Sequence, residues 1–227
     1  MFRVNGLALQ GVGANAVGPP LVGAFLQGAA TGDNEITYTF TGQSFGAAAA
    51  DRRLILGIGA IDGADTNTPA VTIGGVAAAL VGEQYADTYT GLFGAHVPAG
   101  TSGSVVITFG SLRHSCQISL YRVTGMRSDA QLVPVSVDER ISQPASPQLQ
   151  FTVNEVAGGL GIGAAYSDDN QSMTWGGGYS RNYNVGDSTR WMSSAIKTIL
   201  TPLDPSVVPV TWSGAGTGST GVLATFR

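Results

Sequence analysis

Short apolar segments alternate with turns along the whole chain of 227 residues. They are rich in Val, Ile, Thr and aromatic residues and are bounded by Gly, Pro, Asn or Ser, which is typical of strands and turns. Val105, Ile107 and Phe109 recur at every second position and therefore share one face of a strand. Because no long stretch has the 3.6-residue period of an amphipathic helix, the pattern predicts an all-β protein.

Six landmarks occur twice, in the same order and at nearly constant spacing. The pairs are Leu21-Val22 with Leu132-Val133, ITYTF with LQFTV, LGIGA (56–60) with LGIGA (160–164), TIGG with TWGG, ITFG with VTWSG, and SLYR with ATFR. An extra loop in the first copy, GQSFGAAAADRR, explains one step in the spacing. Each copy has the usual sandwich size of about 100 residues. We therefore predict two tandem, duplicated antiparallel β-sandwich domains, Ig-like or jelly-roll-like, at residues 20–126 and 127–227.

The glycines of LGIGA leave one face of the strand nearly bare, so a large side chain must lie over them. We expect these covering side chains to come from the facing sheet, with Phe109 and Trp212 as candidates at matched positions. The repeated pentapeptide is thus interpreted as architectural.

Residues 1–19 precede the duplication and form the predicted N-terminal arm. The arm is rich in Gly, Ala and Val and has almost no charge, so it has little to hold it folded by itself. We expect it to dock onto a neighbouring protein; packing against its own two domains is the alternative.

Charged residues make up only 11% of the chain, and the net charge is −4. Lys197 is the only lysine, and no Lys/Arg cluster is available to grip phosphates, so nucleic acid is not an expected partner. No apolar run is long enough to cross a membrane, and the N-terminus lacks the pattern of a secretory signal. The single cysteine, Cys116, lies in an apolar strand and is expected to be inert core packing.

Acidic residues follow the LGIGA strand in both copies. Asp62 and Asp65, with Asn67, and Asp168 and Asp169, with Asn170, offer oxygen ligands for Ca²⁺. The same residues are ordinary constituents of β-turns, which is the favoured interpretation, so no metal or other cofactor is predicted.

A catalytic constellation is not evident. Glycoside hydrolysis needs two carboxylates at a defined separation, and nothing in the sequence pairs any two of the acidic residues. A serine nucleophile needs a positioned histidine; His96 and His114 are present, but no GxSxG elbow occurs. The protein is therefore not expected to be an enzyme.

The segment WGGGYSRNYNVGDSTRW (175–191) has the strongest binding signal. If it is extended, Tyr179, Arg181 and Tyr183 share one face, and Trp175 and Trp191 bracket the segment. Aromatic faces flanked by Arg and Asn hydrogen bonds commonly hold glycans, and Arg190 adds a further donor. The alternative is that these aromatics fill a core or a subunit interface.

The stretch ADRRLILGIGAIDGADTNTPAVTIGGVAAALV, followed by TYTGLFGAHVPAGTSGSVVITF and CQISLYRVTG, resembles a group of virion proteins of tailed bacteriophages and prophages. The resemblance covers roughly residues 36–125, and the second copy echoes it more weakly. It rests on β-sandwich landmarks, so it implies a structural or accessory virion protein and no residue roles.

We therefore expect a non-enzymatic virion component, assembled in the host cytoplasm, that is homo-oligomeric and docks onto other virion proteins through residues 1–19. Its sandwiches would serve host attachment as in a tail fibre or tail tip, with a host-surface glycan as a candidate partner. Capsid decoration or a head fibre is an alternative location. A free carbohydrate-binding module and a polysaccharide hydrolase are the alternatives from other functional classes.

Overall fold

The computed structural model describes residues 19–61, 66–126, 132–142, 147–167, 171–186, 190–213 and 218–227. Within these ranges the chain forms seventeen strands and no helix, and every strand pairing is antiparallel. The predicted all-β class is confirmed. The described part of the chain also forms no helix that is long and apolar enough to span a membrane.

Strands β1 to β9 form the first sandwich. A five-stranded sheet, in the order β1-β9-β3-β7-β6, packs on a four-stranded sheet, β2-β8-β4-β5. The bounds are β1 Val22–Thr31, β2 Glu35–Ser44, β3 Arg53–Ile61, β4 Ala70–Ile73, β5 Val76–Ala77, β6 Ala79–Tyr85, β7 Thr88–His96, β8 Ser102–Arg113 and β9 Ser115–Thr124. Cys116 is buried in the core between these sheets, where burial raises the pKa of its thiol.

Strands β10 to β17 form the second sandwich. A five-stranded sheet, β10-β17-β12-β15-β14, packs on a three-stranded sheet, β11-β16-β13. The bounds are β10 Ser136–Ile141, β11 Gln148–Glu155, β12 Gly159–Ser167, β13 Thr174–Trp175, β14 Ser180–Gly186, β15 Trp191–Ile199, β16 Leu203–Thr211 and β17 Thr220–Phe226. Its strand order repeats that of the first sandwich, with β10 in the place of β1 and β14 in the place of β6. The predicted boundary after residue 126 adjoins residues 127–131, which lie outside the described residues, as do residues 1–18 of the predicted arm.

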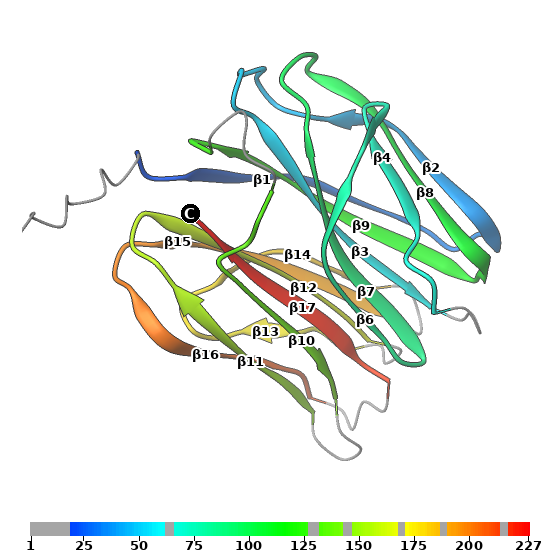
Figure 1. Ribbon diagram of the computed structural model, residues 1–227. Coiled ribbons are helices and arrows are strands. Elements are labelled where there is room, and N and C mark those ends of the chain that lie inside the picture. Colours follow the sequence, from blue (N-terminus) through cyan, green and yellow to red (C-terminus); the bar gives the residue numbers. More distant parts are fainter. Residues whose placement is uncertain are drawn as a thin grey trace, which may run out of the picture.

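The two five-stranded sheets pack face to face, so the molecule is a stack of four β layers (Figure 1). We call the contact between these inner sheets the seam. Its apolar side chains include Ile55 and Tyr121 from the first sandwich and Ile162, Met192 and Phe226 from the second. Consequently β3 and β12, which lie in the middle of the two inner sheets, are buried along their whole length. Each inner sheet therefore contributes to two cores.

Polar side chains also cross the seam. The Tyr121 hydroxyl donates to Ser194 Oγ at 2.7 Å, and Ser115 Oγ lies 3.0 Å from the Tyr166 hydroxyl. Thr88 Oγ1 lies 2.9 Å from the Oγ1 of Thr220. Because these groups are buried, their hydrogen bonds offset the cost of removing them from water.

The two LGIGA copies point their glycines in opposite directions. Gly57 and Gly59 of β3 face the seam, where Ala164 lies beside the first and the ring of Tyr166 covers the second. Gly161 and Gly163 of β12 face the core of the second sandwich instead, beneath the rings of Tyr179 and Trp175. Large side chains do cover the glycines, as predicted, but they are not Phe109 and Trp212.

A one-residue shift explains this inversion. Tyr121 on β9 pairs with Ile55, and its counterpart Phe226 on β17 pairs with Leu160. Leu160 therefore takes the place of Ile55 and not of Leu56, the first residue of the pentapeptide in the first copy. A shift of one residue moves every side chain of a strand to the other face.

Strand β10 protects two exposed sheet edges. Its Asp138 Oδ2 accepts a hydrogen bond from the backbone N–H of Thr152 on β11, at 2.5 Å, and also binds Arg140. Its Glu139 Oε1 accepts from the backbone N–H of Glu83 on β6, at 2.9 Å. Each carboxylate thus occupies a donor that a sheet edge would otherwise present to another strand.

The molecule has two distinct ends (Figure 1). At the terminal end, the N–H of Leu21 donates to the carbonyl of Gly158 at 2.8 Å, and Arg227 Nη1 lies 3.2 Å from the carbonyl of Pro19. At the opposite end, which we call the loop end, strands β1, β3, β12 and β14 finish. The β1–β2 turn lies at the loop end.

Candidate functional site

The predicted aromatic segment begins inside the core of the second sandwich. The ring of Trp175 stacks on Phe151 with centroids 6.0 Å apart and an interplanar angle of 2°, and its Nε1 donates to Ser193 Oγ at 2.9 Å. Tyr179 lies next to Trp175 in the same core and is 5% exposed. Burial raises the pKa of the Tyr179 hydroxyl, and the nearby Glu155 carboxylate raises it further. Neither ring presents a face to solvent.

Tyr183 lies on β14, on the face of the five-stranded sheet that forms the seam. Strand β14 has an irregularity between Arg181 and Tyr183, which breaks the alternation that the sequence pattern predicts. Tyr183 therefore points into the seam, where its ring covers Gly28 of β1 and packs near Phe25. The prediction that Tyr179, Arg181 and Tyr183 share one face is wrong.

The remaining residues of the predicted contact lie nearer the surface. Arg181 is exposed and donates to the carbonyl of Met173 at 2.5 Å. Trp191 is half-buried, and its Nε1 donates to Asn184 Oδ1 at 2.8 Å; Arg190 is also half-buried. The described residues of the segment thus supply mainly packing, and their aromatic rings form no open platform.

The predicted Ca²⁺ ligands Asp62, Asp65, Asp168 and Asp169 lie outside the described residues. The strands before them, β3 and β12, both end at the loop end of the molecule. Within the described ranges, no group of three or more His, Cys, Asp or Glu side chains is close enough to hold a metal ion.

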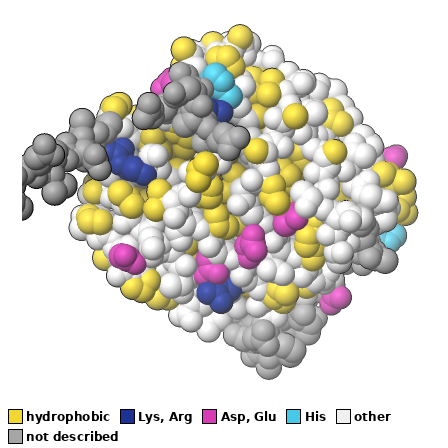
Figure 2. All heavy atoms as spheres, viewed as in Figure 1, with side chains coloured by type: hydrophobic (Ala, Val, Ile, Leu, Met, Phe, Trp, Pro, Cys, Tyr) yellow, Lys and Arg dark blue, Asp and Glu magenta, His cyan; other side chains and the backbone are white. Residues whose placement is uncertain are grey.

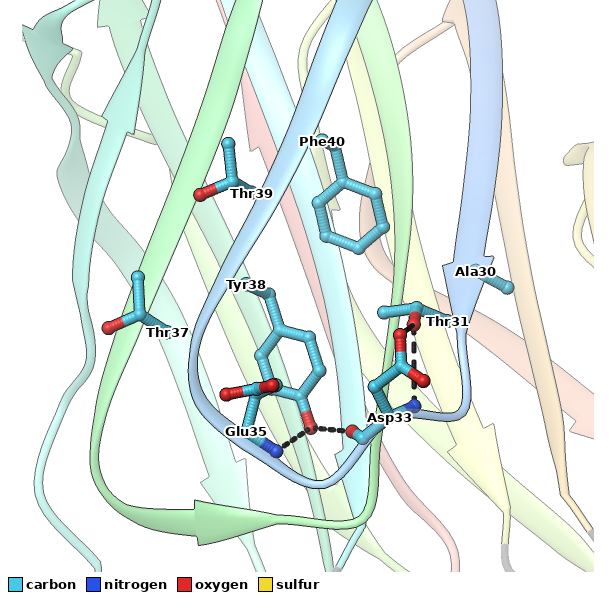
Figure 3. Close-up of a pocket in the computed structure, with 8 residues that line it drawn as sticks. All are labelled: Ala30, Thr31, Asp33, Glu35, Thr37, Tyr38, Thr39 and Phe40. Carbon is cyan, nitrogen blue, oxygen red and sulfur yellow. Dashed lines mark hydrogen bonds between the residues drawn. The ribbon is translucent and has the colours of Figure 1, made fainter.

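A polar pocket of about 320 Å³ lies at the loop end, beside the β1–β2 turn (Figure 3). Its walls carry the carboxylates of Asp33 and Glu35 and the hydroxyl of Thr31, whereas the side chains of Thr37 and Thr39 point to the opposite face of β2 from Tyr38 and Phe40 (Figure 3). Asp33 Oδ2 accepts a hydrogen bond from Thr31 Oγ1 at 2.8 Å, which orders the turn. The residues that line the pocket offer several acceptors and no cationic side chain, so the pocket suits a hydroxyl-bearing ligand without a negative charge.

Tyr38 anchors this pocket to the fold. Its ring is buried against Phe109, and its hydroxyl lies within hydrogen-bond distance of the carbonyls of Asp33, at 2.7 Å, and Arg113. Burial raises the pKa of Tyr38 to about 12, so the hydroxyl stays protonated at neutral pH. The β1–β2 turn is therefore held against the end of β8.

A smaller cleft of about 140 Å³ adjoins this pocket, and the two share Ala30 and Thr31. The cleft lies across the seam, between the end of β1 and Val185 and Gly186 of β14. Gln117 of β9 also lines it; this residue is 2% exposed, and its Oε1 accepts no hydrogen bond within the described structure. A buried amide oxygen without a donor is uncommon and calls for a ligand or water.

The buried charges elsewhere are engaged within the fold. Lys197 Nζ donates to both carboxylate oxygens of Glu155, at 2.9 and 2.7 Å, and lies 5.5 Å from the ring centroid of Tyr179. The guanidinium of Arg52, which is fully buried, donates to five backbone carbonyls and so joins the loops beside β2 and β7. On the face shown in Figure 2, basic side chains are few and separated.

The sequence interpretation did not single out the loop-end pocket. A signal was present in TGDNE (31–35), where acidic and amide residues fill the turn between two strands. A second signal was the alternation of polar residues in SCQISLY, which puts Gln117 and Ser119 on one face of a buried strand. A polar face on a buried strand indicates an interface rather than an ordinary core.

No protein-family model and no curated protein sequence matches this chain. Among solved structures, the crystal structure of PBSX exported protein XepA matches over 90% of this chain and 86% of that chain, with 12% sequence identity and a TM-score of 0.23. A likeness this weak carries no functional argument.

Proposed function

We propose that the protein is a non-enzymatic structural or accessory component of a tailed-bacteriophage virion. It docks onto other virion proteins through residues 1–19, assembles as a homo-oligomer in the host cytoplasm and turns its loop end toward the host surface. Attachment to the host, as in a tail fibre or tail tip, is the role that this orientation serves.

The observation that carries the proposal is the polarity of the molecule. Pro19, the last residue of the predicted arm, lies at the terminal end beside Arg227. The pocket lined by Asp33 and Glu35 lies at the other end of β1. A protein anchored through residues that precede Pro19 would thus present the pocket away from its anchor.

The resemblance of residues 36–125 to virion proteins supports the same setting. The four-layer stack is also suited to a structural role, because its inner strands are buried on both faces and its polar edges are capped. Closed symmetry in a virion would multiply weak contacts with a host surface.

Deleting residues 2–18 tests the docking role, because it spares Pro19 and its contact with Arg227. We expect the variant to fold with an unchanged thermal unfolding midpoint but to be lost from purified phage particles, as measured by immunoblotting. Incorporation at the level of the parent protein would contradict the proposal.

Cryo-electron microscopy of the particle distinguishes the locations. Density at the tail tip or fibre supports the attachment role, and density on the capsid supports a decoration or head-fibre role instead. Absence from particles would favour a free carbohydrate-binding module. Depolymerisation of a surface polysaccharide that depends on one carboxylate would favour the hydrolase.

A further inference from the structure

We infer that the loop-end pocket and the adjoining cleft form one binding site for a neutral sugar that carries an N-acetyl group. The larger pocket would hold the sugar ring, and the cleft across the seam would hold the acetamido group. This inference deepens the proposed attachment function and rests on it only for its biological setting.

The cleft has the chemistry that an acetamido group requires. Its orphaned acceptor, Gln117 Oε1, can take the hydrogen bond of the acetamido N–H. Ala30 and the 43%-exposed Val185 provide apolar contact for the methyl group. An acetamido group can thus satisfy a buried polar atom and cover an exposed apolar one at the same time.

Gln117 borders the cleft, and its Oε1 is buried behind the cleft wall. On β9 Gln117 lies opposite Ala30 of β1 and Gly59 of β3. The ring of Tyr166 covers Gly59, so the cleft reaches Gln117 from the side of Ala30. Gly32 and Gly186 add only backbone to the cleft. The space is therefore preserved by small residues from both sandwiches.

The larger pocket has the chemistry that a sugar ring requires. Asp33 and Glu35 are acceptors for ring hydroxyls, and the hydroxyl of Thr31 can both donate and accept. A volume of about 320 Å³ lies at the low end of the range for small-molecule sites, which fits a single ring. The two carboxylates would repel a ligand that bears a carboxylate or phosphate, so a neutral sugar is favoured.

The experiment uses the purified full chain and four sugars: N-acetylglucosamine, N-acetylgalactosamine, glucose and galactose. Binding is measured by NMR titration, which also reports whether the Gln117 side-chain amide resonance shifts. We expect each acetylated sugar to bind about five- to tenfold more tightly than its parent, the effect of about one hydrogen bond. N-acetylneuraminic acid, which has the acetamido group and a carboxylate, should bind more weakly than the neutral acetylated sugars.

Gln117→Leu removes the acceptor at nearly constant volume and should abolish the preference for the acetylated sugars. Ser119→Ala is its matched control, since Ser119 lies on the same face of β9 and is equally buried but does not line the cleft. Should Gln117→Leu fail to fold, the exposed Glu35→Gln still tests the ring pocket. Glu35→Gln should weaken the binding of all four neutral sugars and reduce the discrimination against N-acetylneuraminic acid.

Equal binding of acetylated and parent sugars would overturn the inference, as would equal effects of Gln117→Leu and Ser119→Ala. A requirement for Ca²⁺, revealed by loss of binding in EDTA, would also overturn direct contact by the carboxylates. These results are independent of the particle-incorporation experiment. If the protein is incorporated into particles but binds no sugar, the proposed function stands and this inference fails. If it binds the sugars but is absent from particles, the binding site stands and the proposed function fails.

Discussion

The two central strands of the molecule carry the same five residues and use them in opposite ways. In β3, Leu56 and Ile58 fill the core of their own sandwich, and the glycines face the seam. In β12, Leu160 and Ile162 fill the seam, and the glycines face the sandwich core. The difference shows that a matched sequence in two domains does not imply matched faces when the alignment slips by one residue.

The inversion also determines where large side chains fit, both in the seam and in the core of the second sandwich. The seam accepts large residues from β12 because β3 presents glycines there, and Tyr166 fills the space above Gly59. The second core accepts Trp175 because β12 presents Gly163 to it. Seam and core are thus packed by the same device, in which a glycine lies under an aromatic ring.

Replacing Trp175 with alanine should have the largest effect on this arrangement. The ring is 7% exposed, stacks on Phe151 and covers Gly163, so its removal leaves a cavity over a bare strand. We expect a loss of about 3–5 kcal/mol in the free energy of unfolding, measured by urea denaturation. A loss below about 1 kcal/mol would show that Trp175 is a surface platform and not a core residue.

Replacing one glycine of each LGIGA strand with alanine should have the next largest effect. A Cβ at Gly163 would lie 2.6 Å from the Trp175 ring, and one at Gly59 would overlap the ring of Tyr166. Gly163→Ala and Gly59→Ala should each cost about 1–3 kcal/mol of stability.

Double-mutant cycles then assign each glycine to its face. Gly59→Ala should be less costly when Tyr166 is also alanine, and Gly163→Ala when Trp175 is alanine, with coupling of about 0.5–3 kcal/mol. The crossed pairs, Gly59 with Trp175 and Gly163 with Tyr166, serve as controls and should be additive. Coupling in the crossed pairs would contradict the inverted faces.

The smallest expected effect is a loss of stability at alkaline pH, to which seam and core both contribute. Burial raises the pKa of Tyr183 in the seam, and of Tyr38 in the first sandwich, to about 12, above the usual value of 10.0. A raised pKa favours the protonated folded form, so this stability is complete below pH 10 and disappears as pH rises through 12. We expect each tyrosine to account for about 1–2 kcal/mol in that window.

Urea denaturation between pH 9 and pH 12 measures this decline. Tyr183→Phe and Tyr38→Phe should each make the decline shallower, because phenylalanine has no proton to lose. An unchanged pH dependence in both variants would show that neither hydroxyl is protected from ionisation by its burial.

Most of the fold could be predicted from the sequence because strand signals are local. Apolar alternation and turn residues identified the strands, and the ordered landmarks matched β2 with β11, β4 with β13 and β9 with β17. The seam was not predicted, because the pairing of two sheets depends on contacts between residues far apart in the chain. The sequence signal for the seam is the polar alternation of Ser115, Gln117, Ser119 and Tyr121 on β9. In the folded chain, Ser115 pairs with Tyr166 and Tyr121 with Ser194 across the seam.

The aromatic segment shows why site prediction was less successful. The residue types between Trp175 and Trp191 are suited both to glycan binding and to packing. Which of the two they serve depends on the path of the backbone, because it sets the direction of each side chain. The irregularity beside Tyr183 turned one ring into the seam, while Tyr179 remained in the core. The loop-end pocket, by contrast, is lined by the contiguous residues 30–40. Only the adjoining cleft brings this segment together with Gln117 and Val185, whose proximity follows from tertiary structure.

The two carboxylates of β10 have a consequence for the protein at high concentration. An unpaired backbone donor on a sheet edge is a template on which a second molecule can add a strand, and repeated addition produces fibrous aggregates. Asp138 and Glu139 occupy such donors on β11 and β6. Replacing either carboxylate would expose such a donor, so the two residues reduce the tendency of neighbouring copies to pair edge to edge.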